Sequence, residues 1–232
     1  MQRILLKLSG EALAGEKKTG FDEATVIEVA KQIRTIAEEG LEIGIVIGGG
    51  NFWRGRTSET IDRNKADQIG MLATVMNCIY VSDICRYLGL KTEIFTPFVC
   101  GAFTSLYSKD AVEASFAQGK IVFFAGGTGH PYFSTDTATV LRAVEIEAEA
   151  ILLAKAVDGI YDSDPKTNPA AVKYDEITIQ DVIDQKLAAV DLTASILCLE
   201  NKMPMLVFGL NEENSIIRAA KGEIDGTKVL VD

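Results

Sequence analysis

The most constraining feature of this sequence is a regular alternation between short apolar runs of strand length and longer stretches with a helical apolar repeat. Parallel strands need a crossover connection, which is usually a helix, so this alternation predicts a mainly parallel sheet covered by helices on both faces. No linker, internal repeat or low-complexity segment breaks the pattern. We therefore expect one α/β domain over residues 1–232.

These periodicities predict about seven strands and about seven helices. The expected strands are residues 3–9, 41–47, 91–96, 120–125, 150–154, 204–209 and 227–231. The expected helices are residues 22–39, 62–87, 108–118, 135–147, a segment opened by residues 178–181, 191–201 and 211–222, and residues 11–20 are expected to form a polar loop. The helix that ends at residue 87 is apolar almost all round, which predicts burial on two sides, either inside the core or at a subunit interface.

Several of the expected strands end in residues that can carry chemistry. Glycine, lysine or acidic residues follow directly in the segments 7–10, 48–54, 126–136 and 155–164. The carboxyl ends of neighbouring parallel strands meet at one edge of a sheet, where ligands of α/β proteins bind. We therefore expect these four segments to build one composite site.

The glycine run at residues 48–50 makes an anion the natural ligand of this site. Glycine has no Cβ, so the backbone N–H groups of such a loop can approach a phosphate directly. Arg54 could add a bidentate contact to the same anion, and a tight turn with an exposed arginine is the alternative. Lys7 stands in an otherwise apolar strand, where its charge is costly to bury unless it faces an anion or points to water from an edge strand.

A second glycine loop, residues 126–136, leads into another expected helix, whose free N–H groups also favour an anion. Asp136, at the start of this helix, is electrostatically unusual beside a phosphate. It fits the site if it orients Lys7 or acts through Mg²⁺. The alternative is an acidic residue that serves only the helix dipole.

Composition argues against several classes of protein. The net charge of −10 disfavours general nucleic-acid binding, which needs a basic surface. The one histidine, His130, nearly excludes a multi-histidine metal site. Four cysteines without a CxxC pair are typical of buried thiols in a reduced compartment. With no signal-peptide pattern and no apolar run near ~18 residues, the sequence predicts a cytoplasmic protein that does not enter a membrane.

The chain also lacks the P-loop motif, the GxGxxG fingerprint with its later acidic residue, and the protein-kinase signature set. Phosphoryl transfer by a different architecture stays open, because that reaction mainly needs positioning and neutralisation of charge around the transferring group.

Five segments taken together resemble one family. Residues 7–12 (KLSGEA), 46–55 (VIGGGNFWRG), 70–77 (GMLATVMN), 127–136 (GTGHPYFSTD) and 157–165 (VDGIYDSDP) closely resemble the bacterial uridylate kinases of the amino-acid-kinase superfamily. The resemblance runs in order and nearly from end to end. It implies a three-layer αβα sandwich with a mainly parallel sheet. It also implies phosphorylation of UMP to UDP by Mg-ATP, by direct in-line transfer, in pyrimidine nucleotide biosynthesis.

The resemblance assigns roles to matching positions. Lys7 and Asp136 would be catalytic, with Lys7 stabilising the transferring group. The ATP site would comprise Lys7, Leu8, Ser9, Gly10, Gly50, Arg54, Lys155, Tyr161 and Asp164. The UMP site would comprise Gly49, Arg54, Asp67, Thr128, Gly129, His130, Pro131, Tyr132, Phe133, Ser134 and Thr135. Asp67 would accept hydrogen bonds from the ribose hydroxyls, a role suited to a carboxylate. Arg142 and Asp191 are expected to be structural.

Regulation and assembly are implied in the same way. The segment linked to GTP activation matches Gly15, Glu16, Lys17, Lys18, Thr19 and Gly20. UTP would inhibit, and the chain would assemble as a homohexamer. No residue is expected to bind a metal directly, since Mg²⁺ would arrive with ATP. The expected partners are therefore ATP and UMP, with no nucleic acid and no membrane.

Two other functions remain open at this stage. One is a kinase of the same superfamily that acts on a carboxylate or carbamate. Asp67 and residues 128–135 distinguish it from a nucleotide kinase, because a nucleotide acceptor needs a partner for its ribose and a second phosphate pocket. The other is a nucleotide-sensing or storage protein without turnover. Lys7 together with Asp136 argues against it, because a pure binder has no need of a group that stabilises a transition state.

Overall fold

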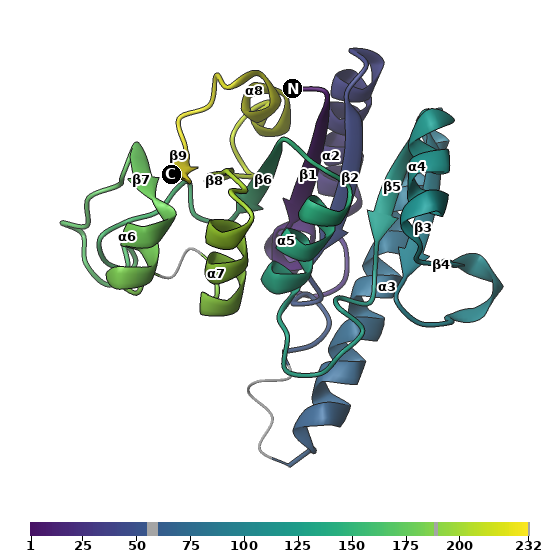
Figure 1. The fold of residues 1–232 in the computed structure, drawn as a ribbon, viewed down its shortest axis with the longest axis horizontal. Coiled ribbons are helices and arrows are strands. Elements are labelled where there is room, and N and C mark those ends of the chain that lie inside the picture. The colour runs from purple at the N-terminus through teal and green to yellow at the C-terminus, as the bar shows by residue number, and fades with distance from the viewer. Residues whose placement is uncertain (55–59, 188–189, 232) are drawn as a thin grey trace.

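The computed structural model describes residues 1–54, 60–187 and 190–231; Gly55, the last residue of the first glycine motif, lies outside them. In this part of the chain nine strands form one sheet in the order β4-β3-β5-β2-β1-β6-β8-β9-β7 (Figure 1). The strands are β1 (Arg3–Leu8), β2 (Glu42–Ile47), β3 (Lys91–Thr96), β4 (Ser105–Leu106), β5 (Lys120–Phe124), β6 (Ala150–Lys155), β7 (Glu176–Thr178), β8 (Met205–Gly209) and β9 (Thr227–Leu230).

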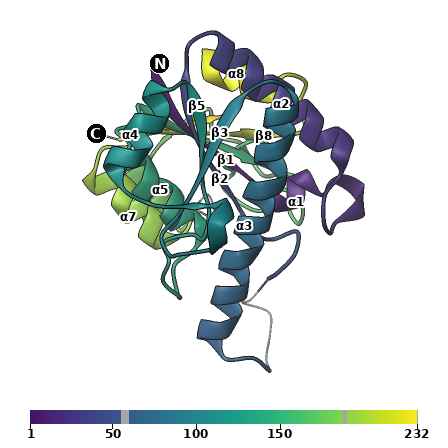
Figure 2. The same cartoon turned by 90° about the vertical axis from the view of Figure 1, so that its right-hand side faces the viewer.

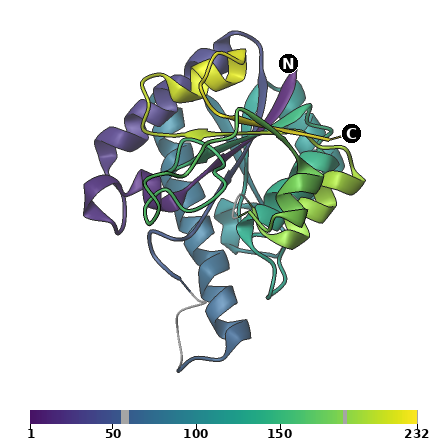
Figure 3. The same ribbon diagram turned by 90° about the vertical axis from the view of Figure 1, so that its left-hand side faces the viewer.

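Helices cover both faces of the sheet. They are α1 (Gly10–Leu13), α2 (Glu23–Glu38), α3 (Arg63–Tyr87), α4 (Lys109–Ala117), α5 (Thr135–Glu145), α6 (Ile179–Asp184), α7 (Leu192–Glu200) and α8 (Ser215–Lys221). Figure 2 shows α2, α3 and α8 on one face and α4, α5 and α7 on the other, and Figure 3 shows α8 beside α2. Two apolar cores result, one on each side of the sheet. The expected α/β class, with its three layers, is confirmed.

Across the residues that the structure describes, the sheet is parallel except at one pairing, where β8 runs antiparallel to β9. Strand β1 lies in the middle, between β2 and β6, with Lys7 opposite Val46 on one side and Leu153 on the other. An edge-strand lysine that points to water is therefore excluded for Lys7. Because β1, β2, β5 and β6 are parallel neighbours, their carboxyl ends share one edge, as the strand-end argument requires.

Three expectations about local structure were wrong. Residues 11–20 are not simply a polar loop, since α1 and a 3₁₀ turn at Gly15–Lys17 occupy most of the segment. Leu13 and Ala14 are fully buried there, so core packing orders a stretch whose glycines favour a loop. The short strands β4 and β7 were missed, because two or three residues give no measurable alternation. The last helix begins at Ser215, later than residue 211.

Helix α3 is buried on its inner side, and a subunit interface on its outer side stays a prediction. Its inner side packs on β3 and α2, and Asn77, Cys78 and Val81 are buried. Its outer side exposes Ile69, Leu72, Met76 and Ile79. By length and composition alone this helix is also long and apolar enough to cross a membrane, a test that core helices of soluble proteins pass as well. Figure 1 shows its first turns projecting beyond the carboxyl ends of the strands.

Candidate functional site

A cleft of about 550 Å³ opens at the carboxyl ends of β1, β2, β5 and β6. It is lined by Lys7, Gly49, Gly50, Trp53, Arg63, Ala66, Asp67, Gly70, Met71, Thr74, Gly127, Thr128, Phe133, Ser134, Thr135, Asp136, Lys155, Val190 and Asp191. The four strand-end segments therefore do meet in one place. Helix α3 adds a wall to the cleft that the strand-end argument did not supply.

Lys7 and Asp136 form an ion pair in this cleft. The distance between Lys7 Nζ and Asp136 Oδ1 is 3.0 Å, and the two side chains are only 12% and 20% exposed. Asp136 lies in the first turn of α5, where Ser134 caps the helix by accepting from the backbone N–H groups of Asp136 and Thr137. The predicted pairing of Lys7 with Asp136 is thus present, and the positive end of α5 faces the same space.

Lys155, the last residue of β6, brings a second ammonium group into the cleft. Burial lowers its pKa below the usual value, the nearby Asp136 carboxylate acts in the opposite direction, and the Lys7 ammonium lowers it further. Two lysines and one aspartate therefore share a partly desolvated site. An anion with more than one negative charge would offset the repulsion between the two ammonium groups.

The glycine loop after β2 lies against the start of α1. Gly48 N–H donates to the carbonyl of Leu8 at 3.0 Å. A Cβ on Gly10 would lie 2.2 Å from the Gly48 carbonyl oxygen, so glycine at position 10 is required by close approach. Gly49 and Gly50 then continue into the cleft wall with no side chain to block a ligand.

Two buried asparagines hold this loop in place. Asn77 Nδ2 donates to the Gly48 carbonyl at 2.6 Å and to Asn51 Oδ1 at 2.8 Å. Asn51 Nδ2 returns a bond to Asn77 Oδ1 at 3.0 Å and donates to the Gly20 carbonyl at 2.8 Å. Helix α3, the glycine loop and the end of the segment 15–20 are therefore joined through a single pair of amides.

Asp67 lines the cleft from the first turns of α3. Its Oδ2 accepts from Arg63 Nε at 2.8 Å and from the backbone N–H of Tyr132 at 2.7 Å. The side chain is 16% exposed and lines the cleft. Arg54 is set back from this wall, because its Nη2 lies 2.5 Å from Glu11 Oε1 and its side chain is 63% exposed.

The loop after β5 separates the cleft from a neighbouring, more apolar cavity of about 680 Å³. Thr128 and Phe133 line both spaces, whereas His130 lines only the neighbouring one. Ser134 donates to Asp191 at the N-terminus of α7, and Thr137 donates to the same carboxylate at 3.2 Å. The loop is therefore fixed from α7 as well as from α5.

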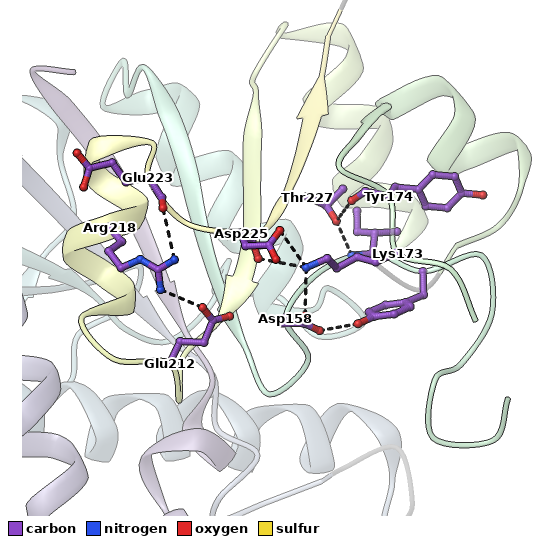
Figure 4. Close-up of polar contacts among 10 residues, drawn as sticks. Asp158, Lys173, Tyr174, Glu212, Arg218, Glu223, Asp225 and Thr227 are labelled. Atoms are coloured by element: carbon purple, nitrogen blue, oxygen red, sulfur yellow. Dashed lines mark hydrogen bonds and ion pairs between the residues drawn. The ribbon is translucent and has the colours of Figure 1, made fainter. Parts of the chain in front are cut away.

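A third cavity of about 390 Å³ lies on the far side of Lys155. Its lining includes Tyr161 and Asp164 together with Lys155, and a role of this cavity in holding adenosine stays a prediction. The Tyr161 hydroxyl donates to Asp158 at 2.8 Å, and Lys173 lies between Asp158 and Asp225 (Figure 4). These bonds tie the segment after β6 to the chain that leads into β9.

Some candidate residues lie outside the main cleft. Leu8 is fully buried in the core, so only its backbone could meet a ligand. Ser9 and Gly10 lie at the start of α1, and Pro131 and Tyr132 lie in the loop after β5. The segment 15–20 reaches the site only indirectly, because Asn51 exchanges hydrogen bonds with Gly20.

Sequence reasoning missed several residues of the cleft, notably Arg63, Thr74 and Asp191. Asp191 was expected to be structural; it caps α7 and holds Ser134, and it also lines the cleft. Thr74 accepts from the backbone N–H of Gly126 at 2.8 Å. The four-residue spacing of Arg63 and Asp67 on a helix was a usable signal, since residues at that spacing face the same side.

Comparison with known proteins places this geometry in a family. Residues 2–209 match the amino acid kinase family. The structure is similar to UMP kinase from Ureaplasma parvum, with a TM-score of 0.93, 35% identity and coverage of 99% of this chain and 98% of that one. UMP kinase from Bacillus anthracis matches with a TM-score of 0.94, 35% identity and coverage of 100% and 96%. Uridylate kinase from Archaeoglobus fulgidus matches with a TM-score of 0.75, 27% identity and coverage of 99% and 100%. The chain belongs to the amino acid kinase family.

Proposed function

We propose that this protein transfers the terminal phosphoryl group of Mg-ATP to UMP, giving ADP and UDP. The observation that carries the proposal is the Lys7–Asp136 pair in a cleft that also holds Asp67 and two glycine-rich loops. The similarity to two bacterial UMP kinases over nearly the whole of each chain supports the choice of UMP as acceptor.

In the proposed reaction an oxygen of the UMP phosphate bonds to the terminal phosphorus of ATP while the bond from that phosphorus to the bridging oxygen breaks. Negative charge spreads over the transferring group and the leaving ADP oxygen. Lys7 neutralises this charge, and Asp136 holds the Lys7 ammonium in place. Lys155 supplies a second positive charge beside them.

The acceptor would lie between α3 and the loop after β5. Backbone N–H groups near Gly49, with Arg54, would contact its phosphate, and Asp67 would accept from its ribose hydroxyls. Residues 128–135 would surround the uracil ring and the phosphate. This arrangement rests on the lining of the cleft by Asp67, Thr128 and Phe133.

The donor would extend from the same centre toward the cavity beyond Lys155. The backbone of residues 8–10 and Gly50 would contact the ATP phosphates, and Tyr161 and Asp164 would frame the adenosine. Lys155 supports this placement, because it lines both the main cleft and the adjoining cavity. The transferring phosphoryl group would then lie beside Lys7.

Mg²⁺ would enter with ATP. Mg²⁺ is usually bound through one or two carboxylates together with substrate phosphates. Among the described residues no group of three or more histidine, cysteine or acidic side chains could hold a metal ion. Asp136, which is paired with Lys7, could contribute a single ligand. When bound, the ion would neutralise phosphate charge.

Assembly and regulation form the outer part of the proposal. A homohexamer is supported by the exposed apolar side chains of Ile69, Leu72, Met76 and Ile79 on α3, a face that a second copy could cover. Activation by GTP through residues 15–20 is supported by the two hydrogen bonds between Asn51 and Gly20, one donated by each residue. The proposal also includes inhibition by UTP, a place in pyrimidine nucleotide biosynthesis and a cytoplasmic location.

The test is ADP release from Mg-ATP with UMP, CMP, dTMP, AMP, GMP, glutamate, aspartate and carbamate supplied one at a time. Selective turnover with UMP is expected. Turnover with only a carboxylate or carbamate would contradict the UMP assignment and indicate another kinase of the superfamily. Tight nucleotide binding without any turnover would indicate a sensor.

A further inference from the structure

We propose that Arg63 is a positioning residue that selects acceptors with a ribose diol, by fixing which oxygen of Asp67 faces the cleft. This rests on the proposed function. The juxtaposition that carries it is a three-way contact between the first turn of α3 and the loop after β5: Arg63, Asp67 and Tyr132 all contact one another.

The contacts to Asp67 are asymmetric. Its Oδ2 accepts both from Arg63 Nε at 2.8 Å and from the Tyr132 N–H at 2.7 Å, which uses the two lone-pair positions of that oxygen. Within residues 1–54, 60–187 and 190–231, both hydrogen bonds to Asp67 fall on Oδ2. The carboxylate is thereby locked in one orientation, with Oδ1 left for a hydroxyl of the ligand.

Tyr132 is held in a backbone conformation that a residue with a side chain seldom adopts. Its φ is +74°, in the left-handed region, and its side chain is 63% exposed. The contacts that offset this cost are the bond from its N–H to Asp67 and the Arg63 guanidinium over its ring, 5.2 Å from the centroid. Arg63 therefore stabilises both ends of the N–H···Oδ2 bond.

The chemical consequence is selectivity for hydroxyl groups. An ionised carboxylate oxygen with no other partner accepts strongly from a hydroxyl, and a site built to do so discriminates against a ligand that lacks it. A ribonucleotide would satisfy Asp67 Oδ1, whereas a 2′-deoxyribonucleotide would leave it with fewer bonds. Without Arg63 the carboxylate could rotate about χ2, and this preference would weaken.

A direct role is the competing explanation, because Arg63 itself lines the cleft and could bind the acceptor phosphate. The two roles differ in how they depend on Asp67. If Arg63 acts through Asp67, its removal has little effect once Asp67 is gone. If it binds the acceptor itself, the two losses multiply. A double-mutant cycle separates these cases.

The experiment measures steady-state kinetics with UMP and with 2′-deoxy-UMP for the wild type, Arg63→Ala, Asp67→Ala and the double variant. Arg63→Ala is expected to raise the KM for UMP about tenfold, with kcat within about threefold and the KM for ATP unchanged. The preference for UMP over 2′-deoxy-UMP should fall toward that of Asp67→Ala. The double variant should match Asp67→Ala within about twofold.

Two further variants guard against general damage. Arg63→Gln keeps a donor in the position of Nε without the charge, so it should retain part of the preference for UMP. Lys65→Ala removes a positive charge from the same helical turn, at an exposed residue outside the cleft, and should leave all constants unchanged.

The positioning role would be overturned if the effects of the two substitutions multiply in the cycle, or if Arg63→Ala keeps the wild-type preference for UMP. In either case the proposed function stands as long as the wild type turns over UMP. No wild-type turnover with UMP would overturn both.

Discussion

The Lys7 ammonium, at the end of the central strand β1, lies 3.0 Å from the Asp136 carboxylate in the first turn of α5. Strand β1 cannot present this lysine elsewhere, because it is paired on both sides. The fold itself therefore sets the position of the positive charge, and Asp136 sets its orientation.

Replacement of Lys7 by alanine should cut kcat by at least about a hundredfold, because charge on the transferring group would lose its nearest ammonium. Binding of UMP, measured by calorimetry, should stay within about threefold, since the proposed acceptor contacts lie on α3, the loop after β5 and the glycine loop with Arg54. The matched control is Lys31→Ala on α2, an exposed lysine paired with Glu28. Equal losses of binding and turnover in Lys7→Ala would contradict a transition-state role.

The Asp136→Asn variant distinguishes two roles for this carboxylate. It keeps the side-chain shape but removes the charge that holds Lys7, so kcat should fall by about a hundredfold or more. The Mg²⁺ concentration that gives half-maximal rate should stay unchanged if the Lys7 contact is what matters. A large shift of that midpoint to higher Mg²⁺ would instead assign Asp136 to the metal.

Lys155 predicts an alkaline limit to activity. Its pKa is lowered by burial, so as pH rises it loses its proton before an ordinary lysine would. Only the charged form attracts phosphate, so the KM for ATP should rise as the pH approaches the lowered pKa of Lys155. The Asp136 carboxylate raises this pKa, and the Lys7 ammonium lowers it further. Lys155→Arg, which stays protonated, should move this limit upward. A profile identical to the wild type would exclude Lys155 as the titrating group.

The lowered pKa of Lys155 also determines how the free energy of unfolding changes with pH. The lowered folded-state pKa means that the unfolded chain binds more protons between the two pKa values. The free energy of unfolding should therefore gain a favourable contribution from Lys155 as pH rises through that window.

The Asn51–Asn77 pair predicts a stability effect away from the chemistry. Asn77→Ala would leave the Asn51 amide and the Gly48 carbonyl buried without their partner, so the free energy of unfolding should fall by about 2–3 kcal/mol. Urea denaturation measures this. Asn64→Ala, at an exposed position on the same helix, should change it by less than about 0.5 kcal/mol. A similar loss in both variants would contradict a specific role for the Asn51–Asn77 pair, because alanine has the higher helix propensity and propensity alone would destabilise neither variant.

Much of the fold could be predicted because the spacing of apolar residues within each segment indicates whether it is a strand or a helix and which of its residues are buried. Lys7 and the glycine loop after β2 could be placed at one edge because parallel neighbours share their direction. The antiparallel pairing of β8 with β9 could not be predicted from the sequence, since it depends on the direction in which the chain returns to the sheet after α8. Helix α1 was hidden because its order comes from burial of Leu13 rather than from its own propensity.

The site was predicted less completely than the fold, for a related reason. Glycine, lysine and acidic residues at the ends of strands can be recognised from the sequence alone. The contacts of Arg63 and Asp191 are with segments that are distant in the chain, so they cannot. The contact of Asp67 with Tyr132 requires a left-handed tyrosine, which no sequence pattern indicates. Asp191 resembles an ordinary helix cap and does cap α7, so its second role is invisible without the fold.

Helix α3 carries much of one wall of the cleft on a single stripe. Arg63, Asp67, Gly70, Met71 and Thr74 line the cleft, and Asn77 continues the stripe to the glycine loop. One residue inserted near the start of this helix would turn everything beyond it by about 100°. Length changes within α3 should therefore be far less tolerated than substitutions on its outer side, and homologues that keep the activity should keep the length of this helix to the residue.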